Sequence, residues 1–140
     1  MDFHLHPMVI HFPVALFVTA LLFEIGSIFS RKEVLRQVAA SIYTLAVATV
    51  PFAVITGLWE AEEWNLTTHK VFVQHRNFAF LTLGISLISF FFVTRGKRQP
   101  RNQRQKTFFL ALLILSACVA VTAFYGGQLV YEYGIGVEEE

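Results

Sequence analysis

Five histidines are the residues of this sequence best suited to bind a metal ion or a haem iron, and they fall in two short stretches. The first stretch holds His4, His6 and His11 and the second holds His69 and His75. The single cysteine, Cys118, lies inside an apolar run, and the sequence has no Cys-x-x-Cys-His segment. These facts exclude c-type haem attachment by that route and a cysteine cluster for iron–sulfur or zinc. Any metal or cofactor must therefore be held by imidazole, carboxylate or Met.

His11 is the first candidate ligand, because Pro7 suits the first turn of a helix and would place His11 about one turn inside it. Pro13 then predicts a kink or a restart, since it cannot donate a backbone hydrogen bond and frees the carbonyl of Val9. Two interpretations stay open. The His11 ring either hydrogen-bonds a freed carbonyl or projects into a helix bundle as a ligand.

His75 begins the third apolar run and would lie on the same side of a membrane as His11. Helix bundles hold haem b between two imidazoles on facing helices. We therefore expect haem b bound by His11 and His75, with His6 as the substitute for either. Arg76 and Trp59 are near enough in sequence to meet the haem propionates. The alternative is that His75 and Arg76 only anchor the helix at the membrane interface.

Copper or zinc is the second hypothesis, because imidazole suits both metals. His4 and His6 form a His-x-His pair with Met8 close by, and Glu62 or Glu63 would add a carboxylate. The candidate metal ligands are His4, His6, His11, His69 and His75. For His4 and His69 a solvated surface position is the favoured reading.

A non-catalytic subunit of a membrane redox complex is the third hypothesis, in which the histidines only shape hydrogen bonds between helices. The sequence has no phosphate-binding loop, dinucleotide fingerprint, Ser-His-Asp set or His-Glu-x-x-His zinc site. An electron carrier or complex subunit is therefore favoured over a stand-alone enzyme. The sequence leaves open whether the chain forms a homo- or hetero-oligomer.

The elements that must position these histidines are membrane helices. Hydrophobic residues make up 55% of the 140 residues and charged residues only 15%, which is too apolar for a soluble domain of this size. Four apolar stretches predict helices at about 7–29, 38–59, 75–93 and 108–130, each close to the ~20 residues that cross a bilayer. We expect a single domain, residues 1–140, that is all-α: an integral membrane four-helix bundle with up-down-up-down topology.

The basic residues predict the orientation of this bundle. Nine of the eleven lie in the first and third links, at Arg31, Lys32, Arg36, Arg95, Lys97, Arg98, Arg101, Arg104 and Lys106. The positive-inside rule places both links in the cytoplasm and both termini on the periplasmic, non-cytoplasmic side. Anionic lipid is then the natural partner of these cations, and no nucleic-acid partner is needed to explain them. Glu24, seven residues before Arg31, could relay protons or pair with a base inside the bundle, but the favoured reading is that it reaches the interface.

Several motifs identify the chain as similar to a known family. Residues 6–16 (HPMVIHFPVAL), Thr56-Gly57-Leu58 with an acid and Trp after it, His75-Arg76-Asn77, and residues 126–137 (GGQLVYEYGIGV) resemble domain of unknown function 2231. This resemblance covers nearly the whole chain. It implies a multi-pass protein of the bacterial inner membrane and a redox setting beside c-type cytochrome, Rieske or quinone-linked partners.

The resemblance also carries over to particular positions. The matching polar residues and glycines are His6, His11, Glu60, His75, Asn77, Gly126 and Gly127, whereas His4 and His69 lie outside the motifs. Gly126 and Gly127 would let a neighbouring helix or a flat cofactor approach the backbone closely.

Overall fold

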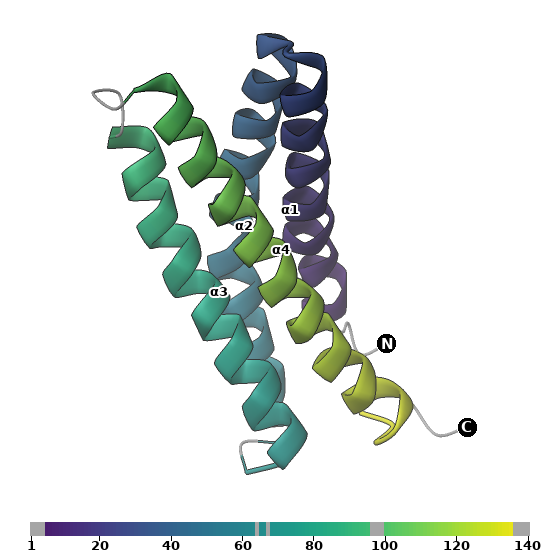
Figure 1. Ribbon diagram of the computed structural model, residues 1–140. Coiled ribbons are helices and arrows are strands. Elements are labelled where there is room, and N and C mark those ends of the chain that lie inside the picture. Colours follow the sequence, from purple (N-terminus) through teal and green to yellow (C-terminus); the bar gives the residue numbers. More distant parts are fainter. Residues whose placement is uncertain (1–4, 64, 67, 96–99, 136–140) are drawn as a thin grey trace.

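Four helices form the part of the chain that the computed structural model describes, which is residues 5–63, 65–66, 68–95 and 100–135, without the side chains of residues 63 and 95. They are α1 (Leu5–Ser30), α2 (Glu33–Glu63), α3 (Lys70–Arg95) and α4 (Arg101–Tyr131) (Figure 1). Each is long and apolar enough to cross a membrane. The expected all-α fold with four such helices is therefore confirmed. Every helix extends beyond its apolar run, because polar residues at its ends continue the helical backbone.

The turns after α1 and α2 each contain a residue with a left-handed backbone. Arg31, with a φ of 57°, forms a two-residue link with Lys32 between α1 and α2. Asn65 has a φ of 52° just after α2, a conformation that Asn adopts more readily than most residues. The proline expected to interrupt the first helix does not end it, since α1 continues through Pro13.

The helices pack as two hairpins. α1 packs mainly against α2 and α3 mainly against α4, and contacts of α1 with α4 and of α2 with α3 join the two pairs (Figure 1). Each helix thus has two close neighbours. α1 and α3 consequently lie diagonally across the bundle, and side chains from both can meet only at its centre.

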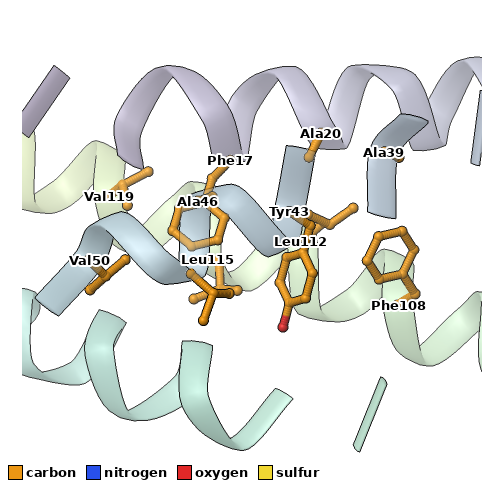
Figure 2. Close-up of a cluster of buried hydrophobic side chains, with 11 residues drawn as sticks. Phe17, Ala20, Ala39, Tyr43, Ala46, Val50, Phe108, Leu112, Leu115 and Val119 are labelled. Atoms are coloured by element: carbon orange, nitrogen blue, oxygen red, sulfur yellow. The ribbon is translucent and has the colours of Figure 1, made fainter. Parts of the chain in front are cut away.

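The centre of the bundle is filled by side chains of α1, α2 and α4 (Figure 2). Small residues on two helices, Ala20, Ala39 and Ala46, are completely buried there and let the backbones approach closely. Tyr43 reaches from α2 toward α3, where its hydroxyl lies 2.7 Å from the Ser89 hydroxyl. A polar contact therefore helps to hold α3 against the core.

Large apolar side chains also cover the outside of the bundle. The exposed ones include Phe12, Phe29, Phe52, Phe92, Ile55, Ile88, Leu110 and Phe124. A soluble protein rarely carries so extensive an apolar surface, whereas lipid tails are a suitable environment for it. Several phenylalanines are therefore placed where they would face lipid.

Glu24 differs from expectation. Its side chain is fully buried, accepts a hydrogen bond from the Ser27 hydroxyl at 3.3 Å, and lies 3.6 Å from Nε of Arg36. The predicted extension of this carboxylate to the interface is therefore wrong. Arg36 on the adjacent helix supplies the opposite charge inside the bundle, and a buried carboxylate needs such a partner.

Two neighbouring leucines test this packing. Leu112 is 0% exposed and Leu113 is 46% exposed, so Leu112→Ala leaves a void in the core while Leu113→Ala changes only the outer face. We expect Leu112→Ala to destabilise the fold by about 2–5 kcal/mol, the usual range for a buried leucine. Thermal unfolding in detergent should show a clear fall in Tm for Leu112→Ala and little change for Leu113→Ala. Equal falls would contradict the packing described above.

Candidate cofactor site at the histidine end

One end of the bundle, which we call the histidine end, brings together the start of α1, the end of α2, the start of α3 and the end of α4. The backbone N–H of His6 donates a 2.7 Å hydrogen bond to the Glu60 carboxylate. This N–H belongs to the first turn of α1, where backbone donors have no partner within their own helix. The negative charge of Glu60 also suits the positive end of the helix dipole. Glu60 on α2 thus caps α1 and fixes where His6 lies.

The His6 ring is held by α2. Its Nδ1 lies 3.2 Å from the hydroxyl oxygen of Thr56. That hydroxyl also lies within hydrogen-bond distance of the Phe52 and Ala53 carbonyl oxygens of α2. In the tautomer in which the hydroxyl donates to a carbonyl, Nδ1 of His6 donates to the hydroxyl and Nε2 has the free lone pair.

The His75 ring is held in a similar way by α4. Its side chain is 7% exposed, and its Nδ1 lies 2.9 Å from the backbone carbonyl oxygen of Thr122. A carbonyl only accepts hydrogen bonds, so Nδ1 of His75 must be protonated. Nε2 is again the nitrogen that is left for a ligand. An N–H donated to a backbone carbonyl is the usual outer hydrogen bond of a metal-binding histidine.

Two glycines make room for these rings. A Cβ atom placed on Gly57 would lie 2.7 Å from Cε1 of His6, and one placed on Gly126 would lie 3.2 Å from Cε1 of His75. The first distance is shorter than any ordinary contact and the second is tight. Each imidazole therefore lies directly against the backbone of the neighbouring helix in its hairpin.

The two rings meet across the bundle. Their centroids are 6.0 Å apart and their planes are perpendicular. His6 belongs to α1 and His75 to α3, so the contact joins the diagonal helices and the two hairpins. The structure therefore brings two imidazoles from different hairpins into contact at the histidine end.

Two cavities meet at the histidine pair. The larger, about 420 Å³, is lined by all four helices and by Ile135 in the turn after α4, and its lining is mostly apolar. The smaller, about 60 Å³, extends deeper into the bundle past Pro13, Val50 and Val119. The larger volume is within the roughly 300–1,000 Å³ typical of small-molecule and cofactor sites. The histidine end can therefore accept an apolar ligand beside the rings.

His11 lies apart from the pair. Its side chain is exposed at the rim of the larger cavity, and its Nδ1 hydrogen-bonds the Pro7 carbonyl oxygen one turn earlier in α1. The ring therefore bonds a backbone carbonyl, as in the first interpretation, but that of Pro7 and not the Val9 carbonyl freed by Pro13. The structure brings His6, the substitute in the sequence prediction, to the place beside His75.

The remaining predicted cofactor residues divide into two groups. Arg76 lines the larger cavity and lies over the Phe72 ring, 5.9 Å from its centroid, and Gly126 and Gly127 line the same cavity. Of these two glycines, only Gly126 lies against a histidine. The nearest atom to a Cβ placed on Gly127 would be in Tyr131, 4.0 Å away. Trp59 is 64% exposed and does not line the cavity.

The other candidate metal ligands are separated from the pair or lie outside the described residues. His69 packs against the Tyr133 ring, with centroids 4.6 Å apart, and its Nδ1 is buried without a hydrogen-bond partner among the described residues. His4 and the side chain of Glu63 lie outside the description. Within residues 5–63, 65–66, 68–95 and 100–135, no three side chains of His, Cys, Asp or Glu gather as a metal-binding group.

Sequence reasoning did not assign two of the residues that hold the rings. Gly57 was part of a motif but had no assigned role. The available signal was its small size directly before the large residues Leu58 and Trp59. Thr122 acts through its backbone carbonyl, which any residue type supplies, so its identity carried no signal. Thr56 stood in the same motif as Gly57, and its bond to His6 joins α2 to α1.

Comparison with known proteins places the chain in one group. The model of a family described as a predicted membrane protein, DUF2231, matches residues 3–139. No curated protein and no solved structure matches the chain significantly.

Alanine at the two ring-contacting glycines tests the site geometry. We expect Gly57→Ala to lower the Tm in detergent, because its Cβ would displace His6, and Gly126→Ala to lower it less. Gly84→Ala on α3 is the matched control, since no atom lies within 4 Å of its added Cβ. There alanine should raise stability slightly, as helix propensity favours it by about 1 kcal/mol. A Gly57→Ala protein as stable as Gly84→Ala would contradict the close contact.

Proposed function

The chain belongs to the DUF2231 family of predicted membrane proteins, and we propose that it is an electron-transfer protein that binds haem b between His6 and His75. It would exchange electrons between the quinone pool or a membrane partner and a redox protein, such as a c-type cytochrome or a Rieske protein, on the outer side.

The facing imidazoles carry this proposal. Helix bundles commonly hold haem b through histidines on facing helices. The His6 and His75 centroids are separated by 6.0 Å, and both rings are held through Nδ1. The donor chemistry and the closeness of the rings support haem b that would be held by His6 and His75.

The chain's own residues would perform three tasks. Thr56 and the Thr122 carbonyl orient the rings and keep Nε2 unprotonated. Gly57 and Gly126 leave room for the rings beside the helix backbones. The apolar lining of the larger cavity excludes water, and Arg76 in that lining supplies a positive charge suited to a carboxylate such as a propionate. Haem bound there supplies reversible one-electron transfer.

The proposed setting is the bacterial inner membrane, with the helices crossing it up-down-up-down and the histidine end on the periplasmic side. The support is the distribution of charge. Arg31, Lys32, Arg36, Arg101, Arg104 and Lys106 all lie at the end of the bundle opposite the histidines. Positive residues favour the cytoplasmic side of a membrane protein.

An absorption spectrum tests haem binding. Protein purified in detergent after haem-replete expression should show a Soret shift and an α band in the reduced-minus-oxidised difference. His6→Ala and His75→Ala should each abolish the bands, because each removes an axial ligand. His11→Ala is the matched control from the same helix as His6 and should keep them.

Other outcomes of this experiment would decide between the rivals. A wild-type spectrum without these bands rules out haem. Loss of the bands in His11→Ala but not in His6→Ala would return the axial role to His11. A haem-free protein with one equivalent of copper or zinc by elemental analysis would favour a metal site. A protein without any cofactor that co-purifies with a native complex would favour the role of a subunit.

Reporter fusions test the orientation. Alkaline phosphatase, which is active only in the periplasm, should be active when fused after residue 140 and inactive when inserted in the link between α3 and α4. Green fluorescent protein should give the opposite pattern. Active phosphatase in the link would contradict the proposed direction, because the cationic end would then face the periplasm.

A further inference from the structure

A third cavity lies at the end of the bundle opposite the histidines. It has a volume of about 590 Å³ and is lined by the end of α1, the link after it, the start of α2 and the start of α4. Four of its lining side chains are basic: Arg31, Arg36, Arg101 and Lys106. This cavity belongs neither to the histidine pair nor to the proposed electron transfer.

The charges around this cavity do not balance. Arg36 lies 3.6 Å from the Glu24 carboxylate and 3.4 Å from that of Glu33, which also pairs with Arg101. Two carboxylates thus face four cations, which leaves a net charge of +2 among the described side chains. Of the four cations in the lining, Arg31 and Lys106 are the two for which the described residues provide no ion pair.

The donors in the cavity suit a phosphate group. Guanidinium and ammonium groups donate charge-assisted hydrogen bonds to phosphate oxygens, and the amides of Asn102 and Gln105 add neutral donors in the same lining. A phosphate bound there would meet the unpaired Arg31 and Lys106. A phosphodiester would also lower the net charge from +2 to +1 at a place where the helix ends leave the apolar part of the membrane.

Apolar residues around the cavity favour a lipid as the source of that phosphate. Ile28 and Phe109 are part of the lining, so the cavity opens against the apolar surface of α1 and α4. Phe29, Leu110 and Leu113 continue this surface and are 85%, 53% and 46% exposed. A free phosphate would make no favourable contact with these apolar side chains, whereas the acyl chains of a lipid would lie along them.

We propose that this cavity is a binding site for the phosphate head group of an anionic phospholipid, with the acyl chains lying along α1 and α4. The site requires only that the chain is a membrane protein and does not depend on haem. Under the proposed orientation, the bound lipid belongs to the cytoplasmic leaflet.

Native mass spectrometry and thermal unfolding of the full chain in mild detergent test the proposal. The probes are dioleoyl phosphatidylglycerol, dioleoyl phosphatidylcholine and inorganic phosphate, each added to delipidated protein. Phosphatidylglycerol should remain bound and raise the Tm, and the other two should not. Arg31→Gln with Lys106→Gln should weaken phosphatidylglycerol binding roughly tenfold or more, since each removes a charge beside the phosphate.

The matched control is Lys32→Gln with Arg104→Gln, which removes the same charge one residue from Arg31 and two residues from Lys106 but outside the lining. This variant should keep the wild-type affinity. Equal weakening in both double variants would overturn the site in favour of diffuse attraction. Equal binding of phosphatidylcholine, or an equal rise in Tm with inorganic phosphate alone, would overturn an anionic lipid as the ligand.

The wild-type comparison of the three probes stands even if a double variant does not fold. Circular dichroism before lipid addition shows whether each variant is folded. Loss or retention of the haem bands does not bear on this result, so failure of the lipid site and failure of the proposed electron transfer are distinguishable.

Discussion

The contact of two imidazoles with two glycine backbones is the constraint on which the histidine end depends. His6 and His75 come from diagonal helices, which meet only if their side chains reach the centre of the bundle. Each ring also needs space beside the neighbouring helix, and Gly57 and Gly126 provide it. A methyl group at Gly57 would displace the His6 ring, and one at Gly126 would press more lightly on the His75 ring. The cavities on both sides of the pair are bounded by these same rings.

The two ends of the bundle stabilise polar groups by different means. At the histidine end, rings without formal charge are satisfied by a hydroxyl and a carbonyl, and a carboxylate caps a helix. At the other end, full charges are paired with full charges, and Glu24 is buried beside Arg36. A buried ion pair must have excellent geometry to offset the cost of desolvation, whereas a hydrogen-bonded neutral imidazole costs far less. The histidine end is therefore the better place for an apolar cofactor, and the cationic end the better place for an anion.

Much of the fold follows from hydropathy, because four continuous apolar runs leave the backbone no option in lipid except helices. The site was less accessible to prediction. Helical geometry separates residues five positions apart by about 140° around the axis, so His6 and His11 cannot face the same neighbour. The choice between them depended on where α1 begins and how it is capped, which Glu60 on another helix decides. Likewise, the burial of Glu24 depended on the position of Arg36 in a different helix. Such contacts between distant residues are not visible in local patterns.

The division of the bundle into hairpins gives the histidine contact a mechanical meaning. His6 belongs to the first hairpin and His75 to the second, and contacts between the pairs are fewer than those within them. A ligand bound by both rings would act as a non-covalent clasp between the two halves. By closing a long loop of chain it would restrict their relative rotation, much as a disulfide restricts the segments that it joins. The distance between the two rings would in turn depend on the angle between the hairpins. A tilt of one hairpin would therefore change the position of the rings around the bound ligand.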